Sequence, residues 1–160
     1  VARLRDARPD LALSSDFIVG FPGETDEDFE ATMRLVRDVG FAQAYSFKYS
    51  PRPGTPAADM DGQVPESVKA ARLAALQAEL NRQQIAFNET CVGNDMPVLF
   101  DRAGARPGQL VGRSPYMQAV HAELPETLMG EIVTVTIDRA KPNSLAGVAA
   151  GAAPKREAVA

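Results

Sequence analysis

The sequence predicts an α/β region followed by a small antiparallel β-barrel, with a connecting helix between them. Residues 11–50 read as strand, helix and strand, residues 66–88 are alanine-rich, and residues 91–150 hold short β-type runs separated by Gly, Pro, Asn and Asp. The chain has 160 residues, 45% of them hydrophobic, which is enough for one ordinary domain or two small ones. We therefore expect four segments: 1–62 in the α/β region, 63–90 in the helix, 91–150 in the barrel and 151–160 as a flexible tail.

The α/β region begins with a short helix that Pro9 stops, followed by "LALSSDFIVGF", which reads as a buried strand. Next comes a helix with clear ends. Thr25 is a suitable N-cap, three acidic residues follow it at the positive end of the helix dipole, and Gly40 lies where a C-cap glycine is expected.

The stretch "AQAYSFKYS" alternates aromatic and polar residues, which predicts a second strand. Strand, helix and strand with short links indicate a βαβ crossover in a parallel sheet. Two strands are few for a stable sheet, so we expect further strands upstream of Val1.

A proline- and glycine-rich loop, "PRPGTPAADMDGQVP", ends this region, and one long helix follows from Glu66 to about Asn88. Its apolar residues are near helical spacing: Val68, Leu73, Leu76, Leu80 and Ile85. The runs "MPVLFD", "QLVGR", "MQAVHAE" and "GEIVTVTID" then have the spacing of a small antiparallel barrel. No internal repeat is evident.

Composition narrows the function. The formal charge of −4 disfavours a protein that coats nucleic acid non-specifically, and no apolar run approaches a membrane span. We expect a cytoplasmic monomer with no membrane contact. The single cysteine, Cys91, cannot supply the ligands of a zinc or iron-sulfur site, so we expect no metal site in this chain and a structural or exposed role for Cys91 and for the single histidine, His121.

The turn "GFPGET" follows the first predicted strand, at the end of a parallel sheet where ligands usually bind. It lacks the spacing and the Lys-Ser/Thr ending of a phosphate loop, and it has no serine between its glycines as a nucleophile elbow would. Gly20 and Gly23 would let the backbone approach a flat, uncharged group such as a purine. Alternatively, the glycines only make a tight link and the acids only cap a helix.

Two motifs carry a family resemblance. "DFIVGFPGETDEDFEAT" followed by "FKYSPRPGTPA" resembles the closing part of the radical S-adenosylmethionine domain of the MiaB-type tRNA methylthiotransferases. "VGNDMPVLFD", "GRSPYMQAVHAE" and "GEIVTVTIDRAKPNSLAGVA" resemble the TRAM domain, a small β-barrel associated with RNA binding. The resemblance spans about Leu11 to Ala149.

This resemblance implies that residues 1–62 are the C-terminal strands and helices of a partial (β/α) barrel. It implies an enzyme that adds a methylthio group to isopentenyl-modified adenosine beside the tRNA anticodon, with S-adenosylmethionine, two 4Fe-4S clusters, an electron donor and a sulfur source. The family's CxxxCxxC loop and its second cluster domain are absent from this sequence. We therefore expect this chain alone to be inactive, with no catalytic residue of its own.

The resemblance also implies binding residues. Those matched to cofactor contact or to shaping its turn are Ile18, Val19, Gly20, Gly23, Glu24, Phe47, Lys48 and Tyr49. Those expected to contact substrate or tRNA are Arg52, Arg113, Arg139 and Lys141. Residues 91–150 carry five basic and six acidic side chains, a formal charge of −1, so composition by itself does not indicate RNA binding.

Two alternatives stay open. One is a methylthiotransferase that acts on a ribosomal protein. The other is a stand-alone RNA-binding barrel with a helical arm, for which residues 1–62 would have no catalytic part to play.

Overall fold

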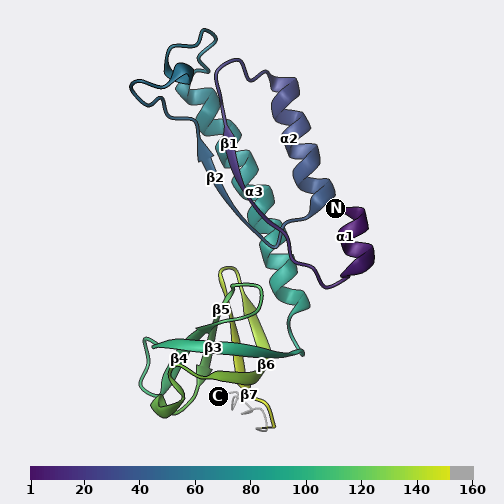
Figure 1. Cartoon of the computed structure of the whole chain (residues 1–160), viewed down its shortest axis with the longest axis vertical. Coiled ribbons are helices and arrows are strands. Elements are labelled where there is room, and N and C mark those ends of the chain that lie inside the picture. Colours follow the sequence, from purple (N-terminus) through teal and green to yellow (C-terminus); the bar gives the residue numbers. More distant parts are fainter. Residues whose placement is uncertain (152–160) are drawn as a thin grey trace, which may run out of the picture. The chain divides into compact units, whose positions relative to one another are not determined.

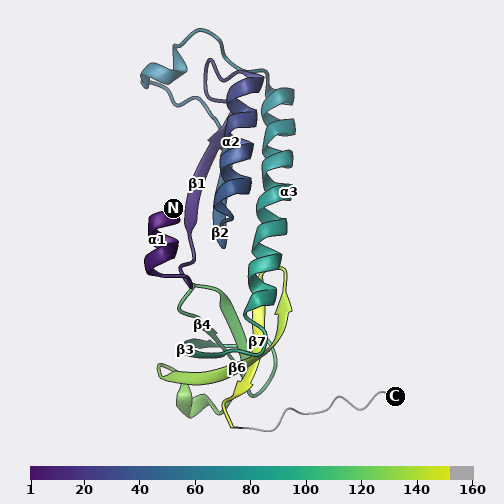
Figure 2. The same ribbon diagram turned by 90° about the vertical axis from the view of Figure 1, so that its right-hand side faces the viewer.

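The computed structural model describes residues 1–151, and the chain divides into two compact units, Val1–Gln84 and Ile85–Ala160 (Figures 1 and 2). These are called the first and second units below. The predicted flexible tail falls, apart from Gly151, outside the described residues.

The first unit is built around one βαβ element. A short helix, α1 (Ala2–Ala7), precedes strand β1 (Ser14–Val19), helix α2 (Asp26–Val39) and strand β2 (Gln43–Lys48). The two strands pair in parallel, which confirms the predicted crossover arrangement. The core of the unit lies between one face of this sheet and the helices, and its buried residues are Phe17, Val19, Met33, Val36, Val39, Phe41, Leu76 and Leu80.

Helix α2 has the ends that the sequence predicts. The Thr25 hydroxyl accepts a hydrogen bond from the Asp28 backbone N–H, and the Asp28 carboxylate accepts one from the Thr25 N–H, which makes a capping box. Gly40 ends the helix with a φ of 62°, in the left-handed region that glycine adopts at low cost.

The sequence predicts a buried strand here, but only one face of β1 is buried. Phe17 and Val19 enter the core, whereas Ile18 between them is 60% exposed. Successive side chains of a strand point to opposite faces, and within the described residues only one face of this two-stranded sheet is covered.

The long helix α3 (Glu66–Thr90) follows a loop that contains a short 3-10 turn, η1 (Pro56–Ala58). Leu76 and Leu80 are buried in the core of the first unit, but Ile85, expected on the same apolar face, is 38% exposed. The boundary between the two units falls inside this helix, between Gln84 and Ile85, so its apolar face does not continue along its whole length.

The second unit is a closed five-stranded barrel. Its strands are β3 (Asp95–Ala103), β4 (Gln109–Arg113), β5 (Ala119–Glu123), β6 (Ile132–Lys141) and β7 (Ser144–Ala149), with a 3-10 turn, η2 (Glu126–Leu128), before β6. They are joined in the order β3-β4-β5-β7-β6, and β6 pairs with β3 to close the barrel.

Two predictions for this barrel were wrong. It is not purely antiparallel, because β5 and β7 pair in parallel. Strand β7 was not predicted, because "SLAGVA" is made largely of small residues and lacks a strong alternation of apolar and polar side chains. It completes the barrel, since it lies between β5 and β6.

A short internal repeat, missed in the sequence, also appears in the barrel. "FDRA" (100–103) and "IDRA" (137–140) each cross a register shift in their strand, the first opposite β4 and the second opposite β7. Phe100 then faces Gly112, and Ile137 faces Gly147, so "LVG" and "LAG" occupy equivalent places in the β3–β4 and β6–β7 pairs.

Candidate functional site

The uncovered face of the β1–β2 sheet brings together two of the residues predicted to contact the cofactor. Ile18 and Phe47 are paired in register near the carboxyl ends of the two strands. They are 60% and 54% exposed, and Tyr45, on the same face two residues before Phe47, is 60% exposed. This is an exposed apolar surface at the end of a parallel pair, where α/β proteins usually bind ligands.

Tyr49, also predicted to contact the cofactor, lies beside the turn that follows β1. Its ring packs edge-on against Phe21, with centroids 5.3 Å apart, and the Lys69 ammonium lies 6.0 Å from its centroid. Its hydroxyl is buried and has no hydrogen-bond partner among residues 1–151. Buried hydroxyls are usually hydrogen-bonded, so this donor is a point at which a bound group would gain an interaction.

Val19 and Lys48 are arranged differently from the other predicted residues. Val19 is 1% exposed and packs in the core, so it reaches this region only through its carbonyl, which accepts a hydrogen bond from the Tyr49 N–H at 2.8 Å. The Lys48 ammonium pairs with the Glu66 carboxylate at the start of α3. Their contact with a cofactor stays a prediction, limited for Val19 to the backbone.

The turn after β1 is held by its own side chain. The Glu24 carboxylate accepts a hydrogen bond from the Gly20 N–H at 2.9 Å, and the Gly23 N–H donates to the Gly62 carbonyl at 2.9 Å. Both glycines have positive φ angles, 75° at Gly20 and 84° at Gly23. The Glu24 carboxylate therefore stabilises the turn by this hydrogen bond.

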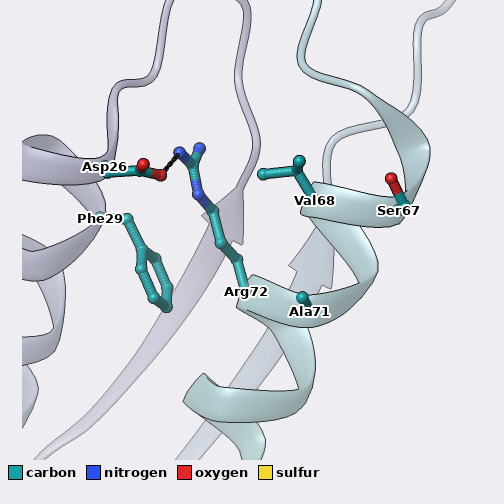
Figure 3. Close-up of a pocket in the computed structure, with 6 residues that line it drawn as sticks. All are labelled: Asp26, Phe29, Ser67, Val68, Ala71 and Arg72. Carbon is teal, nitrogen blue, oxygen red and sulfur yellow. Dashed lines mark hydrogen bonds and ion pairs between the residues drawn. The ribbon is translucent and has the colours of Figure 1, made fainter.

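Sequence reasoning missed Arg72, which fixes this turn from α3. Its guanidinium donates to the Glu24 carbonyl and carboxylate at 3.1 and 2.7 Å. It also donates to the Asp26 carboxylate at 2.6 Å (Figure 3). Its Cζ lies 5.6 Å from the Phe29 ring centroid. Burial acts to lower the pKa of Arg72, but the hydrogen bonds to Asp26 and Glu24 raise it above its ordinary value.

A pocket of about 390 Å³ lies beside Arg72 on the helical side of the first unit. It is lined by Asp26, Phe29, Ser67, Val68, Ala71 and Arg72 (Figure 3). None of the residues predicted to bind the cofactor lines it.

Gly20 and Gly23 form a matched pair that tests how tightly the turn is packed. A Cβ at Gly20 would overlap the Lys69 side chain and lie 2.8 Å from its Cδ, whereas nothing lies within 4 Å of a Cβ at Gly23. Both changes to alanine carry the cost of a left-handed φ, but only Gly20→Ala must also displace Lys69. We expect Gly20→Ala to lower the free energy of unfolding by about 1–2 kcal/mol more than Gly23→Ala in urea titrations. Equal losses would show that Lys69 moves aside freely.

The residues predicted to contact RNA are less constrained. Arg52 is exposed in the loop after β2, and Arg139 and Lys141 are exposed on β6. Arg113 is partly exposed and donates to the Met117 carbonyl at 3.2 Å. The carbonyls of Lys141 and Pro142 accept hydrogen bonds from the Asn88 side-chain amide, so the β6–β7 turn is anchored to the end of α3.

Cys91 is buried, at 2% exposure, and His121 is partly exposed on β5. Among residues 1–151, no group of three or more His, Cys, Asp or Glu side chains is placed to hold a metal ion. In the same part of the chain, no helix has the length and apolar character needed to cross a membrane.

Comparison with known proteins adds two findings. Residues 89–150 match the TRAM domain family. Over 148 residues, 92% of this chain, the sequence is 60% identical to the tRNA-2-methylthio-N(6)-dimethylallyladenosine synthase of Rickettsia felis, 58% to that of Rickettsia canadensis and 59% to that of Rickettsia rickettsii. The chain spans about a third of the length of these curated relatives, since the match covers 33% of each. The relatives and the TRAM match confirm the resemblance drawn from the two motifs.

Proposed function

We propose that this chain is part of a tRNA methylthiotransferase that adds a methylthio group to isopentenyl-modified adenosine next to the anticodon. The observation that carries the proposal is the identity of 60% over 92% of the chain with a protein named as a synthase of that modified nucleoside. A match of 148 residues includes both motifs and residues of both units. Neither a ribosomal-protein methylthiotransferase nor a stand-alone RNA-binding barrel has comparable support.

In this proposal the β1–β2 sheet is the closing part of a partial (β/α) barrel that binds S-adenosylmethionine. The residues present fit an adenosyl group: Ile18 and Phe47 offer a flat apolar surface, and the Tyr49 hydroxyl, which has no hydrogen-bond partner within residues 1–151, offers a donor. The cofactor would supply a reactive adenosyl fragment when bound. These residues would bind and orient the nucleoside of the cofactor and would exclude water from it.

The iron-sulfur clusters do not fit this chain. Its single cysteine is buried, and the described residues offer no metal-binding group. The ligands for two 4Fe-4S clusters, and the contacts for an electron donor and a sulfur source, would have to come from residues outside this sequence. We propose that the chain alone has no methylthiotransferase activity and that it acts within a monomeric cytoplasmic enzyme.

The barrel is proposed to hold the tRNA through Arg113, Arg139 and Lys141, and Arg52 of the first unit is proposed as a further contact to substrate or tRNA. Each phosphate contact that is lost should lower the slope of log affinity against log salt by about 0.7–0.9. We therefore expect Arg113→Ala combined with Lys141→Ala to weaken binding of this chain to a tRNA transcript and to flatten its salt dependence.

A double variant of equal charge change in the first unit, Arg3→Ala with Arg34→Ala, is the control. It should leave affinity and slope closer to those of the parent chain, because neither residue is among the proposed contacts. If the parent chain binds the transcript no better than duplex DNA of similar length, the proposed tRNA-holding function is wrong.

A further inference from the structure

The repeated "DRA" segments of the barrel place two arginines on its outer surface. Phe100 and Ile137 point into the core, and strict alternation would direct the residue two positions later inward as well. The register shift in each strand inserts one extra residue, so Arg102 instead pairs with Val111 and Arg139 with Ala146. A β-bulge commonly redirects a side chain in this way.

The pairing of the next strand brings His121 beside Arg102. Val111 pairs with Arg102 on one side and with His121 on the other, and Ala146 pairs with His121 on one side and with Arg139 on the other. One row therefore runs from Arg102 on β3 through His121 on β5 to Arg139 on β6. His121 alternates with Val120 and Ala122, which belong to the core, and therefore points outward. Arg102 is exposed and His121 is partly exposed, so the row is accessible from solvent.

Further cations lie close to this row. Burial lowers the pKa of His121, and the charges of Lys141, Arg102 and Arg106 lower it further. These cations come from β6, from β3 and from the turn between β3 and β4.

The remaining surroundings of His121 are mostly uncharged. The residues that pair with it, on β4 and β7, are Val111 and Ala146. Two carboxylates lie near the cluster in sequence. Glu123 follows on the same face of β5. Asp101 lies 4.0 Å from the Arg102 guanidinium, and because this contact is exposed, the Asp101 carboxylate weakens the positive potential only modestly.

We propose that Arg102, His121 and Arg139, together with Arg106 and Lys141, form a phosphate-binding surface that contacts the sugar-phosphate backbone of the tRNA. The inference rests on the proposed function, and it places the main contact around His121 rather than around Arg113. Cations gathered from three segments around an imidazole suit a polyanion, although the barrel as a whole has a formal charge of −1.

The repeat places an arginine on each side of His121. Arg102 and Arg139 follow the same motif across the same kind of register shift, and both are exposed. Each lies two strands from His121 in the same row, Arg102 through Val111 and Arg139 through Ala146. We expect Arg102→Gln to weaken binding of the full 160-residue chain to a tRNA transcript several-fold and to lower the salt slope by about 0.7–0.9. Arg139→Gln should weaken binding to a similar extent, whereas Arg34→Gln, which changes an exposed arginine of α2 in the first unit, should leave both quantities close to those of the parent chain.

Measuring affinity over a pH series tests whether His121 contacts a phosphate of the transcript. A bound phosphate favours the imidazolium form, so binding takes up a proton and the parent chain should bind the transcript more tightly as the pH falls from 7.5 to 5.5. His121→Asn should remove most of this gain and leave affinity at pH 7.5 little changed, because the lowered pKa keeps the imidazole neutral there.

The outcomes separate the two proposals. If the parent chain binds the transcript no better than duplex DNA, the tRNA function fails. If it binds the transcript, but Arg34→Gln weakens binding as much as Arg102→Gln or the pH series of His121→Asn matches that of the parent, the surface around His121 is wrong and the tRNA function stands. Displacement of the transcript by poly-glutamate at equal charge concentration would indicate an acidic protein partner and would also overturn the inference.

If circular dichroism shows that the Arg102→Gln chain does not fold, Arg106→Gln, which changes a loop residue, takes its place in the test.

Discussion

Replacing Arg72 by methionine is expected to lower the free energy of unfolding of the first unit by about 3–5 kcal/mol. The Arg72 and Glu24 side chains are 7% and 14% exposed, and their ion pair is 2.7 Å long. Methionine keeps much of the volume but leaves the Glu24 carboxylate buried without its cation, and breaking one partner of a buried pair is strongly destabilising. Urea denaturation followed by amide hydrogen exchange in β1 and α2 measures the loss.

Removing the charge of Glu24 as well separates the loss of the ion pair from the loss of packing around Arg72. Glu24→Gln combined with Arg72→Met should cost clearly less than the sum of the two single changes, because the double variant leaves no buried unpaired charge. The ion pair of Arg72 with Asp26 adds little to this result, since the Asp26 side chain is 95% exposed. Additive losses would mean that Arg72 stabilises the turn through packing alone.

Gly112→Ala is expected to destabilise the barrel by about 3 kcal/mol or more. A Cβ at this position would overlap the Leu99 carbonyl oxygen and lie 2.8 Å from its carbonyl carbon and 2.7 Å from a Val98 methyl group. The main obstacle is backbone of the neighbouring strand, which cannot rotate away as a side chain can. Thermal unfolding followed by circular dichroism, with hydrogen exchange in β3 and β4, measures the effect.

Two other glycines of the barrel serve as comparisons for the loss of stability in Gly112→Ala. At Gly147, the equivalent position of the repeat, an added Cβ would lie 2.8 Å from the Thr136 carbonyl oxygen, so Gly147→Ala should cost less than Gly112→Ala but more than a change in open space. Gly108 has a φ of 72° and nothing within 4 Å of its Cβ position, so Gly108→Ala reports backbone strain alone. If all three variants lose equal stability, close approach of the strands is not the reason for glycine at 112.

The elements that the sequence predicts well are those with local causes. The capping box of α2 joins residues three apart, and Gly40 ends the same helix through its own φ angle. The interaction of Arg72 with Glu24 joins residues 48 apart, and nothing local distinguishes Arg72 from the other charged residues of α3. Such a contact depends on how α3 packs against the turn, which no local pattern encodes.

The residues of the candidate site also differ in how far the sequence could predict them. Ile18 and Phe47 were matched from the motifs, and the structure pairs them in register on one exposed face. Val19 was assigned beside them, although neighbouring residues of a strand point to opposite faces, so Ile18 and Val19 could not both have offered side chains to one ligand. Period-two alternation was a signal already in the sequence. The outward direction of Arg102 could not have been found in this way, because the register shift before it interrupts the alternation.

Closure of the barrel has a consequence for how the two units behave in concentrated solution. All five strands from β3 to β7 have a partner on both sides, so the barrel offers no free strand edge to another molecule. Within residues 1–151, β1 and β2 each have one partner, and Ile18, Tyr45 and Phe47 are exposed beside their open edges. Edge-to-edge association and aggregation of this chain would therefore begin in the first unit, and a group that covers that sheet would protect the chain from both.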